Sequence, residues 1–221
     1  MVDPGKASTG PPGWLTDLAA ATSAMRVLPV SRPPASGGRK SAVLILFGDG
    51  PAGPDLLFIQ RGAGLRRHAG QPAFPGGALE EDELADPDGG PVAAALREAQ
   101  EEVGLDPAGV DVLAVLPEMF IPRSGFRVVP VLAWWRSPVA VYPVDIGEVA
   151  AVERIAVADL ADPTHRLMLR MPGGRLSPAF RVGAMLIWGF TAGLVDRLLA
   201  LAGWERPWDA GVVRELPEGA A

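Results

Sequence analysis

The stretch that decides the fold lies near the middle of the chain and reads Arg97-Glu98-Ala99-Gln100-Glu101-Glu102-Val103-Gly104-Leu105. If it is helical, Glu98, Glu101 and Glu102 stand at positions i, i+3 and i+4, which puts three carboxylates on one side of one turn. Like charges this close repel one another, so such a helix is expected to hold a cation. Just upstream, the tight turn at residues 74–77 (FPGG) supplies a backbone carbonyl that can join them. The stretch predicts a divalent-metal site suited to phosphate chemistry.

This stretch belongs to a predicted helix from Pro91 to Val103, with proline at its first position and Gly104 just past its end. The helix has a single apolar stripe made of Val92, Leu96, Ala99 and Val103. At about 100° per residue, the three glutamates lie on a different face from that stripe. One face can therefore dock on a sheet while the acidic face looks into a cleft. The alternative is a solvated acidic face in which Arg97 and Glu101 form an i,i+4 ion pair.

Apolar and β-branched runs separated by turn residues predict the remaining elements. The predicted strands are 41–47, 56–60, 110–115, 127–135 and 149–155, and the further predicted helices are 14–23 and 180–202. Strands, helix, strands and helix in this order indicate an α+β fold, with a mixed sheet between helices in an α/β/α sandwich. The stretch from residue 205 onward is interrupted by Pro and Gly, so we expect it to lie on the surface.

Length, charge and composition exclude several classes of protein. With 221 residues, the chain is long enough for one sizeable core and short for two full domains. Its net charge of −6 argues against a protein that binds nucleic acid by covering the phosphates. It has no cysteine, which excludes disulfides, thiolate metal sites and cysteine nucleophiles. The sequence begins without a basic region followed by an apolar run, so we expect no secretory signal and a cytoplasmic enzyme.

One apolar run, Val182–Val195, raises the question of a membrane segment. It is shorter than the roughly 18 residues of a membrane span, and Arg181 and Asp196 bracket it. We therefore expect a buried or half-buried core helix here. A membrane-associated protein is the distant alternative.

Gly77 followed by residues 97–105 resembles the Nudix box, whose second half reads Arg-Glu-apolar-x-Glu-Glu-x-Gly-apolar. The resemblance implies the Nudix fold, with a curved mixed sheet between helices. It also implies a hydrolase that uses Mg²⁺ or Mn²⁺ to split diphosphates linked to another moiety. The Nudix domain is expected at residues 41–203, after an N-terminal extension with a short helix and linker at 1–40 and before a C-terminal tail at 204–221.

The first half of the box departs from the family pattern. Glu83 follows Gly77 after the usual five residues, but thirteen residues instead of seven separate Glu83 from Arg97. The extra residues lie in LADPDGGP, residues 84–91, which we interpret as a longer surface loop. The insertion leaves open whether Glu83 has a role, and the same holds for its neighbours Glu80, Glu81 and Asp82.

A second similarity points to one branch within the Nudix family. Residues 56–77, LLFIQRGAGLRRHAGQPAFPGG, are similar to the extended motif of the coenzyme A diphosphatases, and residues 188–193, WGFTAG, are also similar to that branch. Gly62 and Pro72 depart from the motif. The resemblance implies an enzyme that cleaves coenzyme A to 3′,5′-ADP and 4′-phosphopantetheine. The matching positions are Leu56, Leu57, Arg61, Leu65, Arg66, His68, Gly70, Gln71 and Phe74 to Gly77.

The resemblance also implies a set of metal ligands. Glu98 and Glu102, one helical turn apart, are the first choice, since Mg²⁺ favours carboxylate oxygens completed by water and substrate phosphate. Glu101 is either a third ligand or a partner that orients the ligands. The carbonyl of Gly76 is the expected backbone ligand.

The catalytic candidates are Arg97, Glu98, Glu101 and Glu148. Arg97 is expected to anchor a glutamate through an ion pair and not to touch substrate. The general base is either Glu98 or Glu148, which directly precedes the predicted strand 149–155. The alternative for Glu148 is an exposed carboxylate that leads a strand.

A local basic cluster in this acidic protein is the candidate substrate site. Arg61, Arg66 and Arg67 are suited to steering a polyanion such as the 3′-phosphate of coenzyme A. His68 can contact phosphate or cap a turn. The alternative for the arginines is a solubilising role on the surface. The tryptophans expected in the core are Trp134, Trp135 and Trp188.

Three functions remain in view. The first is a Mg²⁺- or Mn²⁺-dependent coenzyme A diphosphatase. The second is a Nudix hydrolase of another nucleoside diphosphate derivative, such as NADH, ADP-ribose or a dinucleoside polyphosphate. The third is a non-catalytic Nudix-like nucleotide sensor, against which the intact glutamates argue. The expected partner is a small-molecule substrate, with neither nucleic acid nor membrane, and a homodimer stays open.

Overall fold

The computed structural model describes residues 10–23, 37–64, 70–122 and 124–217. The chain divides into two compact units that interleave along the sequence. The first unit comprises Met1–Gly48, Gly76–Gln100 and Leu105–Ala140. The second unit comprises Asp49–Pro75, Glu101–Gly104 and Val141–Ala221. The predicted domain boundaries at residues 40/41 and 203/204 stay a prediction.

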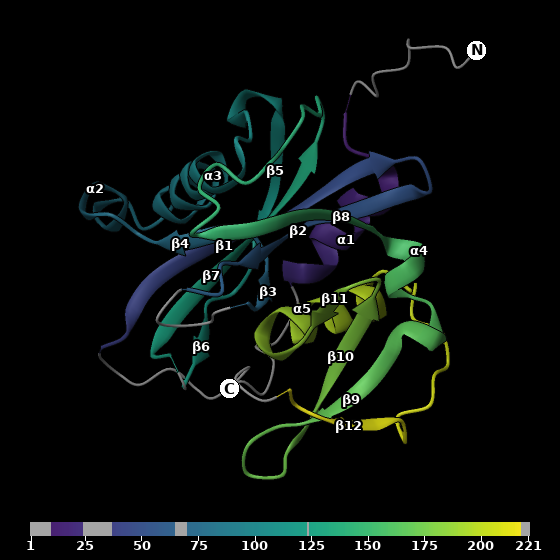
Figure 1. The fold of residues 1–221 in the computed structure, drawn as a ribbon. Coiled ribbons are helices and arrows are strands. Elements are labelled where there is room, and N and C mark those ends of the chain that lie inside the picture. The colour runs from purple at the N-terminus through teal and green to yellow at the C-terminus, as the bar shows by residue number, and fades with distance from the viewer. Residues whose placement is uncertain (1–9, 24–36, 65–69, 123, 218–221) are drawn as a thin grey trace. The chain divides into compact units, whose positions relative to one another are not determined.

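A mixed sheet forms the frame of the first unit (Figure 1). Strand β1 (Arg39–Gly50) runs parallel to β7 (Phe126–Trp135) and pairs antiparallel with β4 (Gly76–Ala78). Strands β5 (Val110–Val115) and β6 (Met119–Ile121) are antiparallel to β7. The α+β class with a mixed sheet, predicted from the sequence, is confirmed.

Helix α1 (Gly13–Ser23) packs on this sheet through an aromatic contact. The Trp14 ring lies edge-on to Phe47 and Trp134, with centroid distances of 5.4 and 6.3 Å. Phe47 and Trp134 are partners in the β1–β7 ladder, so one indole covers two neighbouring strands. The helix predicted at residues 14–23 is confirmed. Two leucines of this helix are buried, namely Leu15 and Leu18.

Helix α3 (Gly90–Val103) matches the predicted helix to within one residue, and Gly104 ends it with a φ of +68°. Of the predicted stripe, Ala99 and Val103 are buried, while Val92 and Leu96 are half-buried. The surface loop predicted for residues 84–91 is wrong at both ends. Its first residues belong to a short helix α2 (Glu81–Ala85), and its last belong to α3.

In the second unit, β2 (Gly53–Arg61) pairs antiparallel with β8 (Val149–Ala156) and with β3 (Pro72–Ala73). The Phe58 and Phe74 rings stack in this unit at a centroid distance of 5.0 Å. A short helix α4 (Val157–Leu160) follows β8 directly. The strands predicted at 56–60 and 149–155 are confirmed as β2 and β8, and each extends beyond its predicted range.

A separate sheet of the second unit has the strand order β11-β10-β9-β12. It consists of β9 (Arg166–Arg170), β10 (Leu176–Val182), β11 (Met185–Ile187) and β12 (Val213–Glu215), and helix α5 (Gly189–Leu201) follows β11.

The helix predicted over residues 180–202 is therefore wrong in its first part. Residue 180 pairs with residue 187 across a turn at Gly183, whose φ is +56°, so the apolar run folds into a hairpin before α5 begins. The core helix expected over Val182–Val195 is likewise present only from Gly189 onward.

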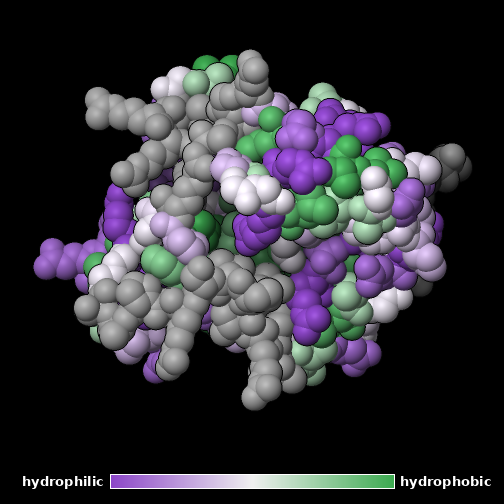
Figure 2. Space-filling model, turned by 90° about the horizontal axis from the view of Figure 1, so that it is seen from below, coloured by the Kyte–Doolittle hydropathy of each residue, from purple (hydrophilic) through white to green (hydrophobic). Residues whose placement is uncertain are grey.

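No helix in the described ranges is long enough and apolar enough to cross a membrane. On the face shown in Figure 2, hydrophobic and hydrophilic residues are interspersed over the coloured part of the surface.

Candidate active site

Arg97 and Glu83 form a two-pronged ion pair in the first unit. The Arg97 Nε donates to Glu83 Oε1 at 2.9 Å, and its Nη2 donates to Oε2 at 3.1 Å. The backbone N–H of Glu80 donates to the same Oε2 at 2.7 Å. Only 8% of Glu83 is exposed. The hydrogen bonds from Arg97 hold the pKa of Glu83 below its usual range, and they raise the pKa of Arg97. A two-pronged pair of this kind fixes the guanidinium in the plane of the carboxylate.

The same guanidinium positions Glu98. Arg97 Nη1 donates to Glu98 Oε1 at 3.0 Å, while Nη2 also donates to the carbonyl of Ala78 on β4 at 3.1 Å. The ion pair that we expected of Arg97 is therefore present, with two glutamates as acceptors. A Cβ at Gly77 would lie 2.2 Å from Glu98 Cδ. Because residue 77 of the Nudix box is glycine, there is space for the Glu98 carboxylate.

Gly76, the proposed backbone ligand, has a φ of +154° and pairs with Val43 of β1. A Cβ here would lie 2.3 Å from the carbonyl oxygen of Ala42, so only glycine lets the two strands approach this closely. The role of its carbonyl stays a prediction.

In the second unit, Glu102 lies beside Arg61. Arg61 Nη1 is 3.6 Å from Glu102 Oε1, and only 8% of the glutamate side chain is exposed. The backbone of Arg61 is held by Gly70 and Gln71, each through a hydrogen bond of 3.0 Å. Within the part of the chain that the structure describes, the buried Nε of Arg61 has no hydrogen-bond partner. A buried, unsatisfied N–H on a cation next to an acidic site is suited to receive an anion.

Glu148 lies next to Arg61 through the backbone. Its carbonyl accepts a hydrogen bond from the N–H of Gly62 at 2.7 Å, and its own N–H donates to the carbonyl of Asp145 at 3.0 Å. A Cβ at Gly62 would come within 2.1 Å of the carbonyl oxygen of Gly147. This explains why glycine stands where the related motif has serine. The Glu148 side chain is exposed.

The other predicted residues lie in different surroundings. Glu101 is exposed on α3. Trp134 and Trp135 are buried, as expected for core residues, while Trp188 is half-buried. The remaining substrate-binding candidates lie outside the described residues, and these are Arg66, Arg67 and His68.

The chemistry of the donors fits a hard divalent cation. Glu98, Glu101 and Glu102 offer carboxylate oxygens along a single helix, and two of these carboxylates have arginines beside them. Among the described residues, no three acidic or histidine side chains form a ready metal cluster. Mg²⁺ does not require one, because it is usually held by one or two carboxylates together with water and substrate phosphates. The assignment of Glu98 and Glu102, at i and i+4, as such a pair stays a prediction.

Comparison with known proteins identifies the family. The NUDIX domain matches residues 38–172. The chain belongs to the NUDIX family. It is 40% identical over 176 residues to an uncharacterized Nudix hydrolase, NudL, of Cronobacter sakazakii, covering 76% of this chain and 85% of that protein. To NudL of Escherichia coli K12 it is 36% identical over 173 residues, covering 72% and 81%.

A solved structure shows the same fold. The crystal structure of RenU, a Nudix hydrolase from M. smegmatis, matches with a TM-score of 0.51 and 21% identity, covering 79% of this chain and 91% of RenU. The predicted Nudix fold is confirmed. With this fold, this domain and these relatives, the chain is an enzyme, a Nudix pyrophosphohydrolase.

In this Nudix enzyme, Glu83 is the residue whose role sequence reasoning left open. The five-residue spacing from Gly77 was the available signal, and the longer interval before Arg97 weakened it. The extra residues are accommodated in helix α2 and in the turn at residues 87–89 that follows it. A Cβ at Gly90 would lie only 1.9 Å from the Glu83 carbonyl oxygen, so the start of α3 closes tightly on α2. Arg97 therefore still reaches Glu83.

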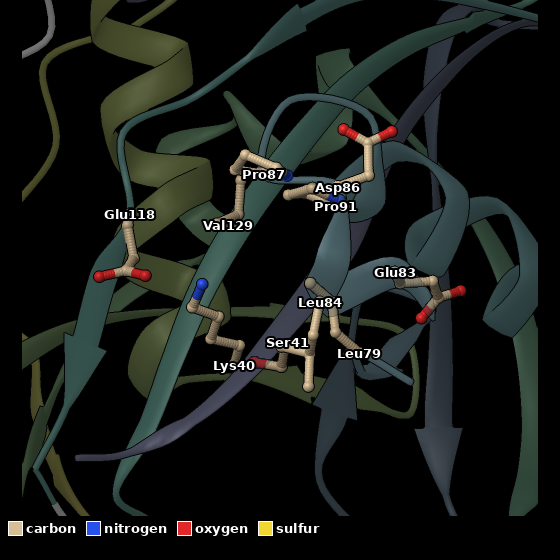
Figure 3. A pocket seen from close by; sticks show the side chains of 10 residues that line it. All are labelled: Lys40, Ser41, Leu79, Glu83, Leu84, Asp86, Pro87, Pro91, Glu118 and Val129. Carbon is tan, nitrogen blue, oxygen red and sulfur yellow. The ribbon is translucent and has the colours of Figure 1, made fainter. Parts of the chain in front are cut away.

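A small cavity lies in the first unit, with Lys40 and Glu118 on one side and Glu83 on the other (Figure 3). Its volume of about 90 Å³ is below the roughly 300 Å³ at which ligand pockets begin. None of the three helix glutamates lines it, so it is not a nucleotide pocket. Its lining consists of Lys40, Ser41, Leu79, Glu83, Leu84, Asp86, Pro87, Pro91, Glu118 and Val129.

Proposed function

We propose that this Nudix hydrolase cleaves the diphosphate bond of coenzyme A or its derivatives, releasing 3′,5′-ADP and 4′-phosphopantetheine, with Mg²⁺ or Mn²⁺ as cofactor. The observation that carries the proposal is the position of Arg61. This arginine of the coenzyme A motif lies against Glu102 of the Nudix helix and keeps a buried N–H without a partner among the described residues. A diphosphate oxygen is the kind of acceptor that this N–H lacks.

A contact within the second unit supports the assignment to this branch. The Thr191 hydroxyl donates to the carbonyl of Pro72 at 3.3 Å in a buried position. Thr191 belongs to the late stretch 188–193, and Pro72 belongs to the motif 56–77. The two stretches that carry the similarity to coenzyme A diphosphatases are therefore in contact, as expected if they serve one substrate site.

The residues divide the work as follows. Glu98 and Glu102 would hold the metal ion, with Glu101 and the Gly76 carbonyl as further candidates. When bound, the ion supplies the positive charge that neutralises the nonbridging phosphate oxygens. Arg97 keeps Glu98 in place through its hydrogen bond of 3.0 Å. Arg61 binds and orients the diphosphate.

The general base is either Glu98 or Glu148, and the two make different predictions. Glu98 is bound by Arg97, whereas Glu148 is exposed and fixed only through its backbone in the described contacts. If Glu148 is the base, Glu148→Gln lowers kcat by about 10²-fold or more and removes the acidic limb of the pH–rate profile. If Glu98 is the base, that limb remains in Glu148→Gln.

Turnover by a Glu102→Gln variant tests the site. The wild type is expected to release 3′,5′-ADP from coenzyme A with Mg²⁺, to lose this activity with EDTA and to regain it with added Mg²⁺ or Mn²⁺. Glu102→Gln should lose at least about 10²-fold in kcat/KM while it retains its melting temperature. Glu153→Gln, an exposed carboxylate on β8, is the matched control and should behave as the wild type. Wild-type turnover in Glu102→Gln would remove this residue from the site.

A panel of coenzyme A, NADH, ADP-ribose and diadenosine tetraphosphate at equal concentration tests the substrate. If another compound of the panel is cleaved rapidly while coenzyme A is left intact, the proposed substrate is wrong, and the assignment as a Nudix hydrolase stands. Binding of nucleotides without cleavage of any of them would favour the nucleotide sensor. A cytoplasmic location stays a prediction, and so does the oligomeric state.

A further inference from the structure

A short segment of the second unit, residues 142–149, connects the last turn of α3 with the residue that follows β2. Near its beginning, the N–H of Val144 donates to the carbonyl of Glu102 at 3.1 Å. Near its end, the carbonyl of Glu148 accepts a hydrogen bond from the N–H of Gly62 at 2.7 Å. The segment therefore ties two backbone positions together that are far apart in the sequence. We call residues 142–149 the brace.

The brace leads into an irregularity of the pairing between β2 and β8. The partner of Gln60 is Ala151, but the partner of the next residue, Arg61, is Val149. Ala150 is therefore an extra residue of β8, which makes this a β-bulge. Bulges bend a strand and change the direction in which a side chain points, and they are frequent next to active sites. The direction of the Arg61 side chain thus depends on how the brace enters β8.

Asp145 closes the turn in the middle of the brace. Its carboxylate accepts a hydrogen bond from the N–H of Gly147 at 2.7 Å. Its carbonyl accepts from the N–H groups of Glu148 and Val149 at 3.0 and 2.8 Å. One aspartate therefore fixes three consecutive N–H groups just before the bulge. A Cβ at Gly62 would come within 2.1 Å of the Gly147 carbonyl oxygen, so Gly62 packs directly against this closed turn.

The brace holds Arg61 on one side only, and the other side is held independently. The N–H of Arg61 donates to the carbonyl of Gln71, and its carbonyl accepts from the N–H of Gly70, each at 3.0 Å. Between these two supports, Arg61 Nη1 lies 3.6 Å from Glu102 Oε1. A change in the turn at Asp145 would therefore move one support of Arg61 and leave the other in place.

We propose that Asp145 is a positioning residue: by closing the turn of the brace, it sets the distance between Arg61, which binds the diphosphate, and Glu102, which holds the metal ion. The inference rests on the proposed function, and it adds a residue that touches neither substrate nor metal. Positioning of this kind matters because a displacement of about 1 Å in a substrate-binding group can lower the rate about 10²-fold.

A second turn of the same unit provides a matched control. The carboxylate of Asp209 accepts a hydrogen bond from the N–H of Gly211 at 2.8 Å, in an exposed Asp-x-Gly turn like that at Asp145. Asp145→Ala should lower kcat/KM for coenzyme A with Mg²⁺ about tenfold, mainly through KM. Asp145→Asn keeps an acceptor oxygen and should recover most of this loss. Asp209→Ala loses the same kind of hydrogen bond and should keep the kcat/KM of the wild type. Equal losses in the two alanine variants would mean that a general loss of stability is responsible, and would overturn the proposal.

A double-mutant cycle tests whether Asp145 acts through Arg61. Arg61→Met removes the guanidinium that the brace is proposed to position. In this background, Asp145→Ala should cause no further loss in kcat/KM. A second tenfold loss in this background would show that Asp145 acts elsewhere, and the proposal would be wrong.

Binding of methylenediphosphonate separates this proposal from the assignment of the substrate, because its P–C–P bridge is not hydrolysed. Calorimetric titration with this compound and Mg²⁺ should give a Kd about tenfold higher for Asp145→Ala than for the wild type, which corresponds to about 1.4 kcal/mol. Asp209→Ala should bind as the wild type does. If coenzyme A is not cut but this difference is found, the proposed function fails and the role of Asp145 stands. An unchanged Kd in Asp145→Ala overturns that role, whether or not coenzyme A is cut.

Discussion

Replacing Glu83 by glutamine tests whether the longer Nudix box still depends on the Glu83–Arg97 ion pair. The variant keeps the shape of the side chain but removes its charge. Arg97 then loses two charge-assisted hydrogen bonds of 2.9 and 3.1 Å, because an amide offers only one oxygen and a competing NH₂ group. The backbone N–H of Glu80 loses an anionic acceptor as well.

The expected loss follows from the burial of the pair. Breaking a fully buried ion pair costs about 3–5 kcal/mol. Here 24% of the Arg97 side chain is exposed, and the guanidinium keeps its hydrogen bonds to Glu98 and to the Ala78 carbonyl. We therefore expect Glu83→Gln to lower the free energy of unfolding by about 2 kcal/mol. For a chain of this length, this corresponds to a fall in Tm of about 4–8 °C.

The pH dependence of this loss identifies its electrostatic origin. The pKa of Glu83 is lowered in the folded protein from its usual value of 4.5, chiefly by the hydrogen bonds from Arg97. An acid with a lowered folded pKa contributes stability that is fully present above its unfolded pKa and is lost as the pH falls through the folded pKa. The difference in unfolding free energy between wild type and Glu83→Gln should therefore be largest near pH 7 and shrink below about pH 4.

Urea denaturation of both proteins in EDTA at a series of pH values measures this difference directly. Glu81→Gln, an exposed carboxylate in the same first turn of α2, is the matched control and should change stability by less than about 0.5 kcal/mol at every pH. The reasoning is refuted if the Glu83→Gln difference stays constant from pH 7 to the acid limit, or if both variants lose the same stability.

Further predictions concern the packing of the second unit. Gly62→Ala should lower the free energy of unfolding by about 1–3 kcal/mol because its Cβ would meet the Gly147 carbonyl oxygen. Gly64→Ala, where nothing lies within 4 Å of a Cβ, should be near neutral in the same thermal melts. Arg166→Met should cost about 2 kcal/mol at pH 7, because it leaves Asp196 without its hydrogen bond from Arg166; the cost is below that of a fully buried pair since 37% of the Asp196 side chain is exposed. Burial raises the pKa of Asp196, so the aspartate takes up a proton as the pH falls, and this loss should be smaller in acid; a loss that grows on acidification would contradict the prediction.

Local signals in the sequence predicted the elements that local physics determines. Strand β5 has the predicted bounds, Val110–Val115, and α3 begins one residue before the predicted Pro91. Here the period of the apolar residues, a proline at the start of a helix and a glycine past its end all agree. The Nudix assignment also followed from such a local pattern, because three glutamates on one helix need no distant partner to be noticed.

The errors arose where pairing between distant residues decides the structure. The apolar run from Phe180 was compatible with a helix, and only its pairing with Ile187 makes it a hairpin. The contact of Arg97 with Glu83 depends on how the inserted residues fold, and the spacing alone does not contain this. Likewise, no local pattern of residues indicates that Arg61 Nη1 lies 3.6 Å from Glu102 Oε1.

The parallel pairing of β1 with β7 has a consequence for the protein during synthesis. Along the edge of β1 that faces β7, residues 39–47 find their partners in residues 126–134. A ribosome adds about 5–20 residues per second, so β7 is synthesised roughly 4–17 s after β1. During that interval the apolar segment Leu44–Phe47 has an unpaired strand edge, with which other nascent chains can form backbone hydrogen bonds. Slower growth at low temperature, or a chaperone that shields this edge, should therefore raise the yield of soluble protein from a recombinant host.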